Sequence, residues 1–124
     1  MTLNISPEKM AEYRAGARKR EAERQAALDE RFALGWQLAR QGADILRSQF
    51  GAAKVVVFGS LVDRERFFER SDIDLAVWGI PEQLYLRAFG SLLDLTTEFS
   101  VDLVRVEEAR DYILQSIEAD GIEL

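Results

Sequence analysis

The sequence predicts a small α+β domain, in which a mixed sheet of three or four strands packs against helices and a long helix comes first. Some segments place apolar residues every three or four positions, which is typical of amphipathic helices. Other segments are short, uninterrupted runs of β-branched residues, which is typical of strands covered on both faces. The expected order is helix, strand, strand, helix, strand, helix, and 124 residues suit one such layered domain.

The first expected helix covers residues 6–50. Ser6 is a suitable N-cap, because its hydroxyl can accept a hydrogen bond from a free backbone N–H of the first turn. Gly35 and Gly42 weaken a helix and indicate either a bend or a close contact at these positions. From residue 28 onward an apolar stripe steps by three or four residues, as a packed helix requires. Its members are Leu28, Phe32, Trp36, Ala39, Ala43, Leu46 and Phe50.

Three strands and two further helices are expected after this helix. Residues 53–58 (AKVVVF) show no polar alternation, and Gly79 with Pro81 closes the second strand. The expected strands are 53–58, 72–78 and 101–106, and the expected helices are 82–98 and 107–119.

A charged loop, residues 61–71, joins the first two strands. Phe67 and Phe68 are expected to anchor this loop to the core. Its arginines are interpreted as solvated loop charges, one of which can contact a phosphate: Arg64, Arg66 and Arg70.

The chain contains neither cysteine nor histidine. Zinc sites built on thiolate or imidazole, cysteine or histidine nucleophiles, and disulfide scaffolds are therefore excluded. Catalysis would have to use carboxylates, hydroxyls, lysine, arginine or a metal held by oxygen. No apolar stretch approaches the roughly 20 residues that a membrane span needs, and no leader peptide is evident. A soluble, cytoplasmic protein is expected.

The net charge of −6 is unevenly distributed along the chain. Residues 1–50 hold nine Lys/Arg against seven Asp/Glu, whereas residues 51–124 hold seven against fifteen. Nucleic-acid binding normally depends on clustered basic side chains. A long DNA or RNA substrate is therefore not expected, because the acidic half would repel its backbone.

Three aspartates on two predicted strands are the candidate metal ligands. Side chains alternate across a strand, so Asp72 and Asp74 point to the same face. Such paired carboxylates repel each other unless a cation lies between them, and Mg²⁺ prefers hard oxygen ligands together with substrate phosphates. Asp102 is a lone acid in a third strand that otherwise reads as buried, and it would complete a cluster able to hold two metal ions if the strands are neighbours.

Gly59 and Ser60 end the first strand and form the candidate phosphate-binding turn. Glycine allows a sharp turn and close approach of the backbone, and serine adds a hydroxyl and an N–H. Neither GxxxxGK[ST] nor GxGxxG is present. Taken singly, the Gly-Ser pair can be an ordinary turn, the two aspartates a solvated strand end, and Asp102 a surface acid on an edge strand. Their combination across three strands favours a nucleotide site.

At these residues the sequence resembles the DNA polymerase beta-type nucleotidyltransferase superfamily, and the run FGSLVDRERFFERSDIDLAVWG resembles the minimal nucleotidyltransferases, or MNT domains. The resemblance covers about residues 34–124, so residues 1–33 are interpreted as an N-terminal helical extension. It implies Mg²⁺-dependent transfer, with two ions, of AMP from ATP to a hydroxyl. By the same resemblance Asp72 and Asp74 bind both metals, Asp102 completes the metal site and assists deprotonation of the acceptor, and Gly59 and Ser60 hold the triphosphate.

The resemblance also implies a partner. Minimal nucleotidyltransferases are commonly paired with a HEPN-domain RNase toxin, and such antitoxins adenylylate a tyrosine of the toxin. The predicted function is therefore that of an antitoxin in a complex with a HEPN toxin. A basic cluster in the extension suits an acidic partner or RNA, although a solvated helix face is the favoured interpretation: Arg14, Arg18, Lys19, Arg20 and Arg24.

Two alternative functions remain open at this stage. In one, the fold is a non-catalytic binding module that inhibits its partner sterically. In the other, the chain is a small-molecule nucleotidyltransferase of the antibiotic-modifying kind that works as a dimer. The sequence contains no motif that selects ATP over other triphosphates or that identifies the acceptor hydroxyl.

Overall fold

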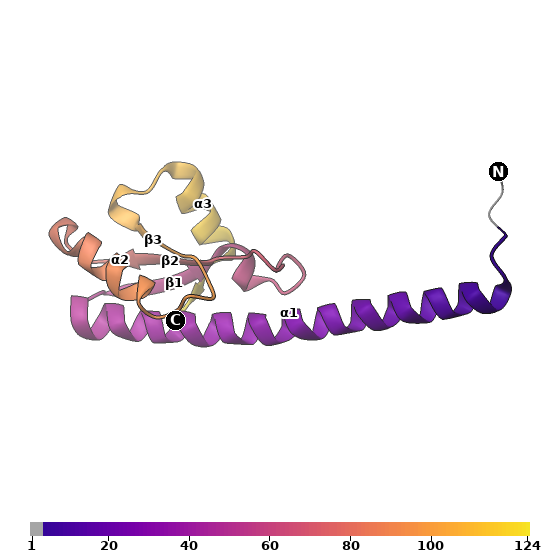
Figure 1. The fold of residues 1–124 in the computed structure, drawn as a ribbon. Helices are drawn as coiled ribbons and strands as arrows, with labels where there is room; N and C mark the ends of the chain where they lie inside the picture. Colours follow the sequence, from indigo (N-terminus) through magenta and orange to yellow (C-terminus); the bar gives the residue numbers. More distant parts are fainter. Residues whose placement is uncertain (1–3) are drawn as a thin grey trace.

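The computed structural model describes residues 4–124, so the first three residues of the predicted extension lie outside the described part of the chain. A four-stranded sheet lies between a long helix on one side and a short helix on the other (Figure 1). The elements in chain order are α1 (Pro7–Phe50), β1 (Lys54–Phe58), β2 (Ile73–Trp78), α2 (Tyr85–Leu93), β3 (Val101–Arg105), α3 (Asp111–Asp120) and β4 (Ile122–Glu123). Single 3₁₀ turns precede or follow some of them: η1 (Gly59–Val62), η2 (Glu82–Leu84) and η3 (Val106–Glu108).

The sheet has the strand order β3-β2-β1-β4. β1 pairs antiparallel with both β2 and β4, whereas β2 pairs parallel with β3. The predicted α+β class with a small mixed sheet is thus confirmed. The sequence did not predict β4, because two residues are too few to show a strand pattern.

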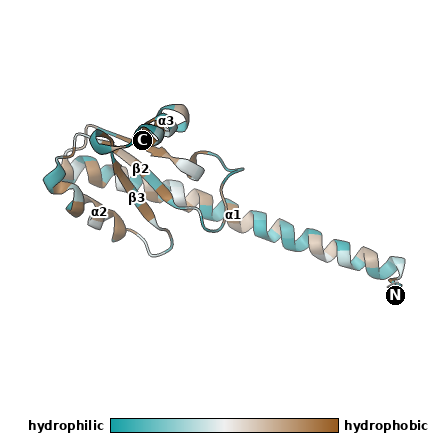
Figure 2. Ribbon diagram, turned by 90° about the horizontal axis from the view of Figure 1, so that it is seen from above, coloured by the Kyte–Doolittle hydropathy of each residue, from teal (hydrophilic) through white to brown (hydrophobic). Residues whose placement is uncertain are grey.

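α1 is one uninterrupted helix of 44 residues. The Ser6 side chain accepts a hydrogen bond from the Lys9 N–H at 3.2 Å, and Gly51 ends the helix with a φ of +73°. The C-terminal half lies along the sheet, and the polar N-terminal part extends beyond the body of the molecule (Figures 1 and 2). Despite this length, no helix within residues 4–124 is apolar enough to cross a membrane.

The two glycines in the second half of α1 are sites of close contact. A Cβ on Gly35 would lie 2.9 Å from Cδ1 of Leu61, and one on Gly42 would lie 3.1 Å from Cδ2 of Leu92. The predicted close contacts are confirmed, and the helix passes through both positions without a break.

The two faces of the sheet carry different side chains. α1 and α2 cover the face formed by Val55, Val57, Leu75 and their neighbours, which belong to the main core. On the opposite face α3 packs through Ile117 against Val56, Phe58 and Ala76, and these residues form a second, smaller cluster. We call this second surface the α3 face.

The predicted boundaries of two helices were wrong. The helix predicted over 82–98 begins with the η2 turn and ends at Leu93. Thr96 then stabilises a turn, because its hydroxyl accepts a hydrogen bond from the Glu98 N–H at 2.9 Å. The last helix begins at Asp111 instead of residue 107, because Glu107 lies in η3 and accepts the Gly79 N–H at 2.7 Å. The third strand accordingly ends at Arg105.

The loop of residues 61–71 is anchored to α1. Phe67 is buried and its ring packs edge-on against Phe32, with the ring centroids 5.3 Å apart. Phe68 is half exposed, so the prediction that it anchors the loop was wrong. Arg64 Nε lies 2.7 Å from Oδ1 of Asp29, so this arginine is held on α1 and is not a freely solvated charge.

Candidate functional site

Two of the three predicted carboxylates lie opposite each other on neighbouring strands. Asp74 in β2 is in register with Asp102 in β3, and adjacent strands are about 4.8 Å apart. Both side chains belong to the α3 face, because the alternate positions Ile73, Leu75 and Leu103 are buried in the main core. The sheet thus brings together two residues that are distant in the sequence.

Asp72 directly precedes β2, two positions before Asp74. It is exposed, as is Asp102, whereas Asp74 is partly buried. The neighbours of Asp102 in the strand, Val101 and Leu103, are buried as expected, and the exposure of Asp102 fits the alternative of a surface acid on an edge strand, because β3 is at the edge of the sheet. An exposed Asp102 can approach a ligand from the edge while Asp74 forms the floor of the site.

The ionisation of Asp74 shows that the three acids interact. Burial, and after it the charges of Asp102 and Asp72, raise the pKa of Asp74 to about 6. Desolvation and neighbouring negative charges both disfavour the carboxylate. The site therefore has an unbalanced negative potential, which a bound cation would relieve.

Gly59 brings the candidate phosphate-binding turn against Asp74. The residue has a φ of +76°, which favours glycine, and a Cβ at this position would collide with Oδ2 of Asp74. The preceding residue, Phe58, is the antiparallel partner of Asp74 in the sheet. The predicted turn therefore lies directly beside Asp74, the central one of the predicted carboxylates.

The η1 turn that contains Ser60 is held in place by α1. The Trp36 indole N–H donates a hydrogen bond to the Leu61 carbonyl oxygen at 2.8 Å, and the Leu61 side chain is fully buried. The absence of a side chain at Gly35 allows α1 to approach this turn closely. Ser60 itself is partly exposed, so its hydroxyl remains accessible beside the carboxylates.

The chemistry of these donors fits a divalent cation that prefers oxygen. All three are carboxylates. The raised pKa of Asp74 means that its charged form is disfavoured unless a positive charge lies nearby. As the side chains stand, no group of three acids within residues 4–124 converges closely enough to hold a metal ion. The exposed Asp72 and Asp102 would have to turn towards Asp74 to complete such a site.

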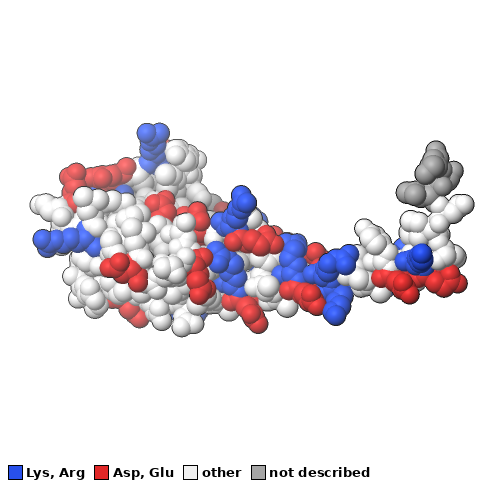
Figure 3. Space-filling model, viewed as in Figure 1, with Lys and Arg blue, Asp and Glu red and all other residues white. Residues whose placement is uncertain are grey.

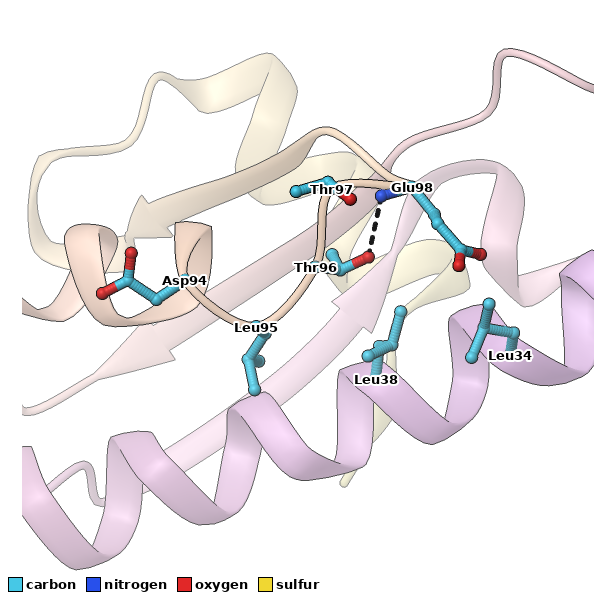
Figure 4. Close-up of a pocket in the computed structure, with 7 residues that line it drawn as sticks. All are labelled: Leu34, Leu38, Asp94, Leu95, Thr96, Thr97 and Glu98. Carbon is cyan, nitrogen blue, oxygen red and sulfur yellow. Dashed lines mark hydrogen bonds between the residues drawn. The ribbon is translucent and has the colours of Figure 1, made fainter.

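A separate groove lies on the other side of the sheet. It has a volume of about 420 Å³ and is formed by α1 and the segment that follows α2 (Figure 4). Its lining is Leu34, Leu38, Asp94, Leu95, Thr96, Thr97 and Glu98. Because α1 borders it, this groove does not contain the predicted site.

Tyr85 is a polar group near the site that the sequence did not indicate. Its hydroxyl donates a hydrogen bond to the Leu103 carbonyl oxygen at 2.6 Å, on the outer edge of β3. Burial, and after it the charges of Asp102 and Glu108, raise the pKa of the Tyr85 hydroxyl. In the sequence Tyr85 is simply one member of the apolar stripe of a helix, so no local signal distinguished it.

Comparisons with known proteins give one family and a consistent set of folds. Residues 41–124 match the family model described as "Polymerase beta, Nucleotidyltransferase". No curated protein matches the chain.

Solved structures of toxin–antitoxin complexes share the fold. A mutant MntA–HpeT complex matches with a TM-score of 0.56 and 19% identity, over 68% of this chain and 70% of the other. The tri-AMPylated Shewanella oneidensis HEPN toxin in complex with MNT antitoxin matches with a TM-score of 0.55 and 19% identity, over 72% of this chain and 70% of the other. A toxin–antitoxin with AMP-PNP matches with a TM-score of 0.55 and 20% identity, over 67% and 69%. At these identities the matches establish a shared fold.

Proposed function

Because the chain belongs to the polymerase beta nucleotidyltransferase family, we propose that it transfers AMP from ATP to a tyrosine hydroxyl of a HEPN-type RNase toxin and thereby acts as the antitoxin. The observation that carries the proposal is that Gly59, in the turn directly after β1, lies beside Asp74 of β2, which is in register with Asp102 of β3. In this arrangement a single triphosphate bound at the turn would reach the acidic side chains.

The residues of the chain have distinct tasks in this reaction. Gly59 and Ser60 hold the triphosphate, since the turn lies against Asp74 and leaves the serine hydroxyl accessible. Asp102 accepts the proton of the acceptor hydroxyl. The hydroxyl oxygen then bonds to the α-phosphorus while the bond from that phosphorus to the oxygen bridging to the β-phosphate breaks, and pyrophosphate leaves.

Mg²⁺ is the cofactor that these donors suit. Asp72, Asp74 and Asp102 would hold it, and when bound it would neutralise the triphosphate and the leaving pyrophosphate. Occupation of the site would also remove the repulsion that raises the pKa of Asp74. Two ions are expected, in keeping with the three-carboxylate set.

The protein acceptor is supported by the solved complexes of similar fold. One of them contains a HEPN toxin that carries AMP, and another contains AMP-PNP. A further complex carries two Asp-to-Glu substitutions two positions apart, which is the spacing of Asp72 and Asp74. These findings concern proteins of low identity, and they motivate the same partner class for this chain.

The proposal is tested with ATP labelled at the α-phosphate, Mg²⁺ and a purified HEPN-domain protein as the acceptor. We expect label on a tyrosine of the HEPN protein, located by mass spectrometry, and no label with the Asp72→Asn/Asp74→Asn variant. An Asp94→Asn variant, which changes an exposed acid away from the α3 face, is the matched control and should label normally. Persistent label with the double variant would contradict the mechanism.

The same double variant decides between catalysis and steric inhibition. If it still suppresses toxicity at normal expression, the chain acts as a binding module and the catalytic proposal is wrong. Loss of suppression with an intact complex, measured by co-purification, would support adenylylation.

A further inference from the structure

A hollow of about 300 Å³ lies beside the site at the edge of the sheet. It is bounded by the outer edge of β3, by Tyr85 and by the first turns of α3. Its lining comprises aromatic, apolar and charged side chains: Tyr85, Leu103, Val104, Arg105, Glu108, Ala109, Arg110, Tyr112 and Ile113. We call it the edge hollow.

The edge hollow runs along the free edge of β3 and reaches the face of the sheet that carries the carboxylates. Val104 lines it and belongs to the cluster under α3, and Asp102 is two positions earlier on the same strand, hence on the same face. The charge of Asp102 also acts on the Tyr85 hydroxyl, which lies at the wall of the hollow. Asp102 does not line the hollow itself, and a group seated there would reach it from the C-terminal side along β3.

The order of strands places the hollow on one side of the acids and the phosphate turn on the other. Gly59 follows β1, Asp74 lies in β2 and Asp102 in β3, and the hollow borders the free edge of β3 from Leu103 onward. A triphosphate bound at Gly59 and Ser60 would extend to the acids from the β1 side. The group that enters from the β3 side meets the α-phosphate from the opposite direction, as the acceptor of an in-line displacement must.

Two of the three charged side chains that line the hollow, Arg105 and Glu108, are paired with each other, and Arg110 is the third. Arg105 lies 2.8 Å from Glu108 and also donates to the Ile80 carbonyl oxygen at 2.7 Å. The hollow therefore offers no concentrated positive charge for phosphates. Instead it offers two aromatic rings, of which Tyr112 is 66% exposed and unpacked, together with the apolar surface of Ile113.

We propose that the edge hollow is the acceptor site, and that it receives the aromatic side chain of the tyrosine that the partner protein presents to Asp102. This inference rests on the proposed function. A planar ring between Tyr85 and Tyr112 would gain apolar contact and aromatic packing while its hydroxyl points towards Asp102. A tyrosine that is part of a folded partner would need no other recognition element on this small chain.

The test fills the hollow and measures which substrate is affected. Ala109→Trp places a bulky ring inside the hollow, and Ala119→Trp places the same ring on the exposed far end of α3 as the matched control. Initial rates of AMP transfer are measured with the HEPN protein varied at saturating MgATP, and then with MgATP varied at saturating HEPN protein. We expect Ala109→Trp to raise the KM for the HEPN protein about 10-fold or more, with the KM for ATP changed less than about twofold.

A second variant guards against misfolding of the first. Tyr112→Ala removes an exposed ring and should fold, and we expect it to raise the KM for the HEPN protein about 3-fold or more. If instead the KM for ATP rises and that for the HEPN protein does not, the hollow holds the nucleoside and the proposal is wrong. If both variants behave like Ala119→Trp, the hollow has no role in the reaction. Absence of transfer by the unaltered chain would contradict the proposed function itself, so the two failures are distinguishable.

Discussion

Two separate constraints meet at Gly59. Its φ of +76° costs any other residue about 1 kcal/mol or more, and its missing side chain makes room for the Asp74 carboxylate. Gly51 has nearly the same φ, +73°, but no atom lies within 4 Å of the position of a Cβ. A comparison of substitutions at the two positions therefore separates the cost of backbone strain from the cost of the steric contact with Asp74.

We expect Gly51→Ala to lower the free energy of unfolding by about 1 kcal/mol, and Gly59→Ala to lower it by about 2 kcal/mol or more. The measurement is urea unfolding followed by circular dichroism. In an Asp74→Ala background the cost of Gly59→Ala should fall to that of Gly51→Ala. Equal costs in the unaltered background would mean that the collision with Asp74 has no energetic weight.

The charged form of Asp74 is expected to lower the free energy of unfolding. Its pKa in the folded chain is about 6, against an ordinary value of about 4. Because the folded-state pKa is the higher one, the protonated side chain favours folding below about pH 4. This contribution is lost as the pH rises through 6.

We therefore expect Asp74→Asn to raise the free energy of unfolding at pH 7.5 in the presence of a chelator. The whole rise in the pKa of Asp74 would correspond to about 3 kcal/mol. Because the side chain is partly exposed, the expected increase in the free energy of unfolding is smaller, about 1–2 kcal/mol. The gain should vanish below pH 4, as measured by urea unfolding over a pH series. Glu30→Gln, at an exposed position of α1, is the control and should show no such pH-dependent gain. A gain that persists at pH 4 would contradict the electrostatic explanation.

At the scale of elements, the contact between α1 and the loop of residues 61–71 illustrates which forces hold the site. Exposed ion pairs connect the two, including Arg24 Nη1 to Glu69 Oε1 at 2.8 Å. Exposed pairs of this kind contribute little, roughly 0–1 kcal/mol. Phe67, in contrast, is 3% exposed and packs against the rings of Phe32 and Phe99.

We expect Phe67→Ala to lower the free energy of unfolding by about 3–4 kcal/mol, because it opens a cavity between α1 and the loop. Glu69→Gln should change it by less than about 1 kcal/mol. Phe68→Ala is the matched control, since this neighbouring ring is half exposed, and its effect should be small. If Glu69→Gln proved as costly as Phe67→Ala, the ion pairs would be the main anchor of the loop.

For the whole molecule, the extended α1 raises the question of where the folding unit begins. Up to residue 27 the described part of the helix has no fully buried side chain, whereas Leu28 is 4% exposed and belongs to the main core. The sequence boundary at residue 34 stays a prediction. The packing of α1 favours a folding unit that begins near residue 25.

We expect a chain that begins at Gln25 to unfold within about 1 kcal/mol of the full chain. A chain that begins at residue 34 lacks Leu28 and the ring of Phe32 that packs on Phe67, and it should lose about 3–6 kcal/mol. Urea unfolding of the three chains is the measurement. Equal stability of the two shortened chains would support the boundary at residue 34.

The basic cluster of the extension and the acidic candidate site lie in different parts of the molecule. The basic cluster of the extension lies on the projecting part of α1, away from the acidic site, and acidic side chains are interspersed among it (Figure 3). Arg24 of this cluster is paired with Glu21 and Glu69. At this position the interpretation of a solvated, internally paired helix face fits the structure.

Local sequence patterns were sufficient to predict most of the elements and to indicate the chemistry proposed for the site. Periodic apolar residues placed α1, β-branched runs placed the strands, and the residue types of Gly59, Asp72 and Asp74 indicated a metal and a phosphate, because these signals are local. How these elements meet became clear from the three-dimensional arrangement. The edge position of β3, the register of Asp102 with Asp74 and the contact of Gly59 with Asp74 depend on pairing between distant segments. A local pattern does not encode such pairing, and the edge hollow beside Tyr85 exists only because of it.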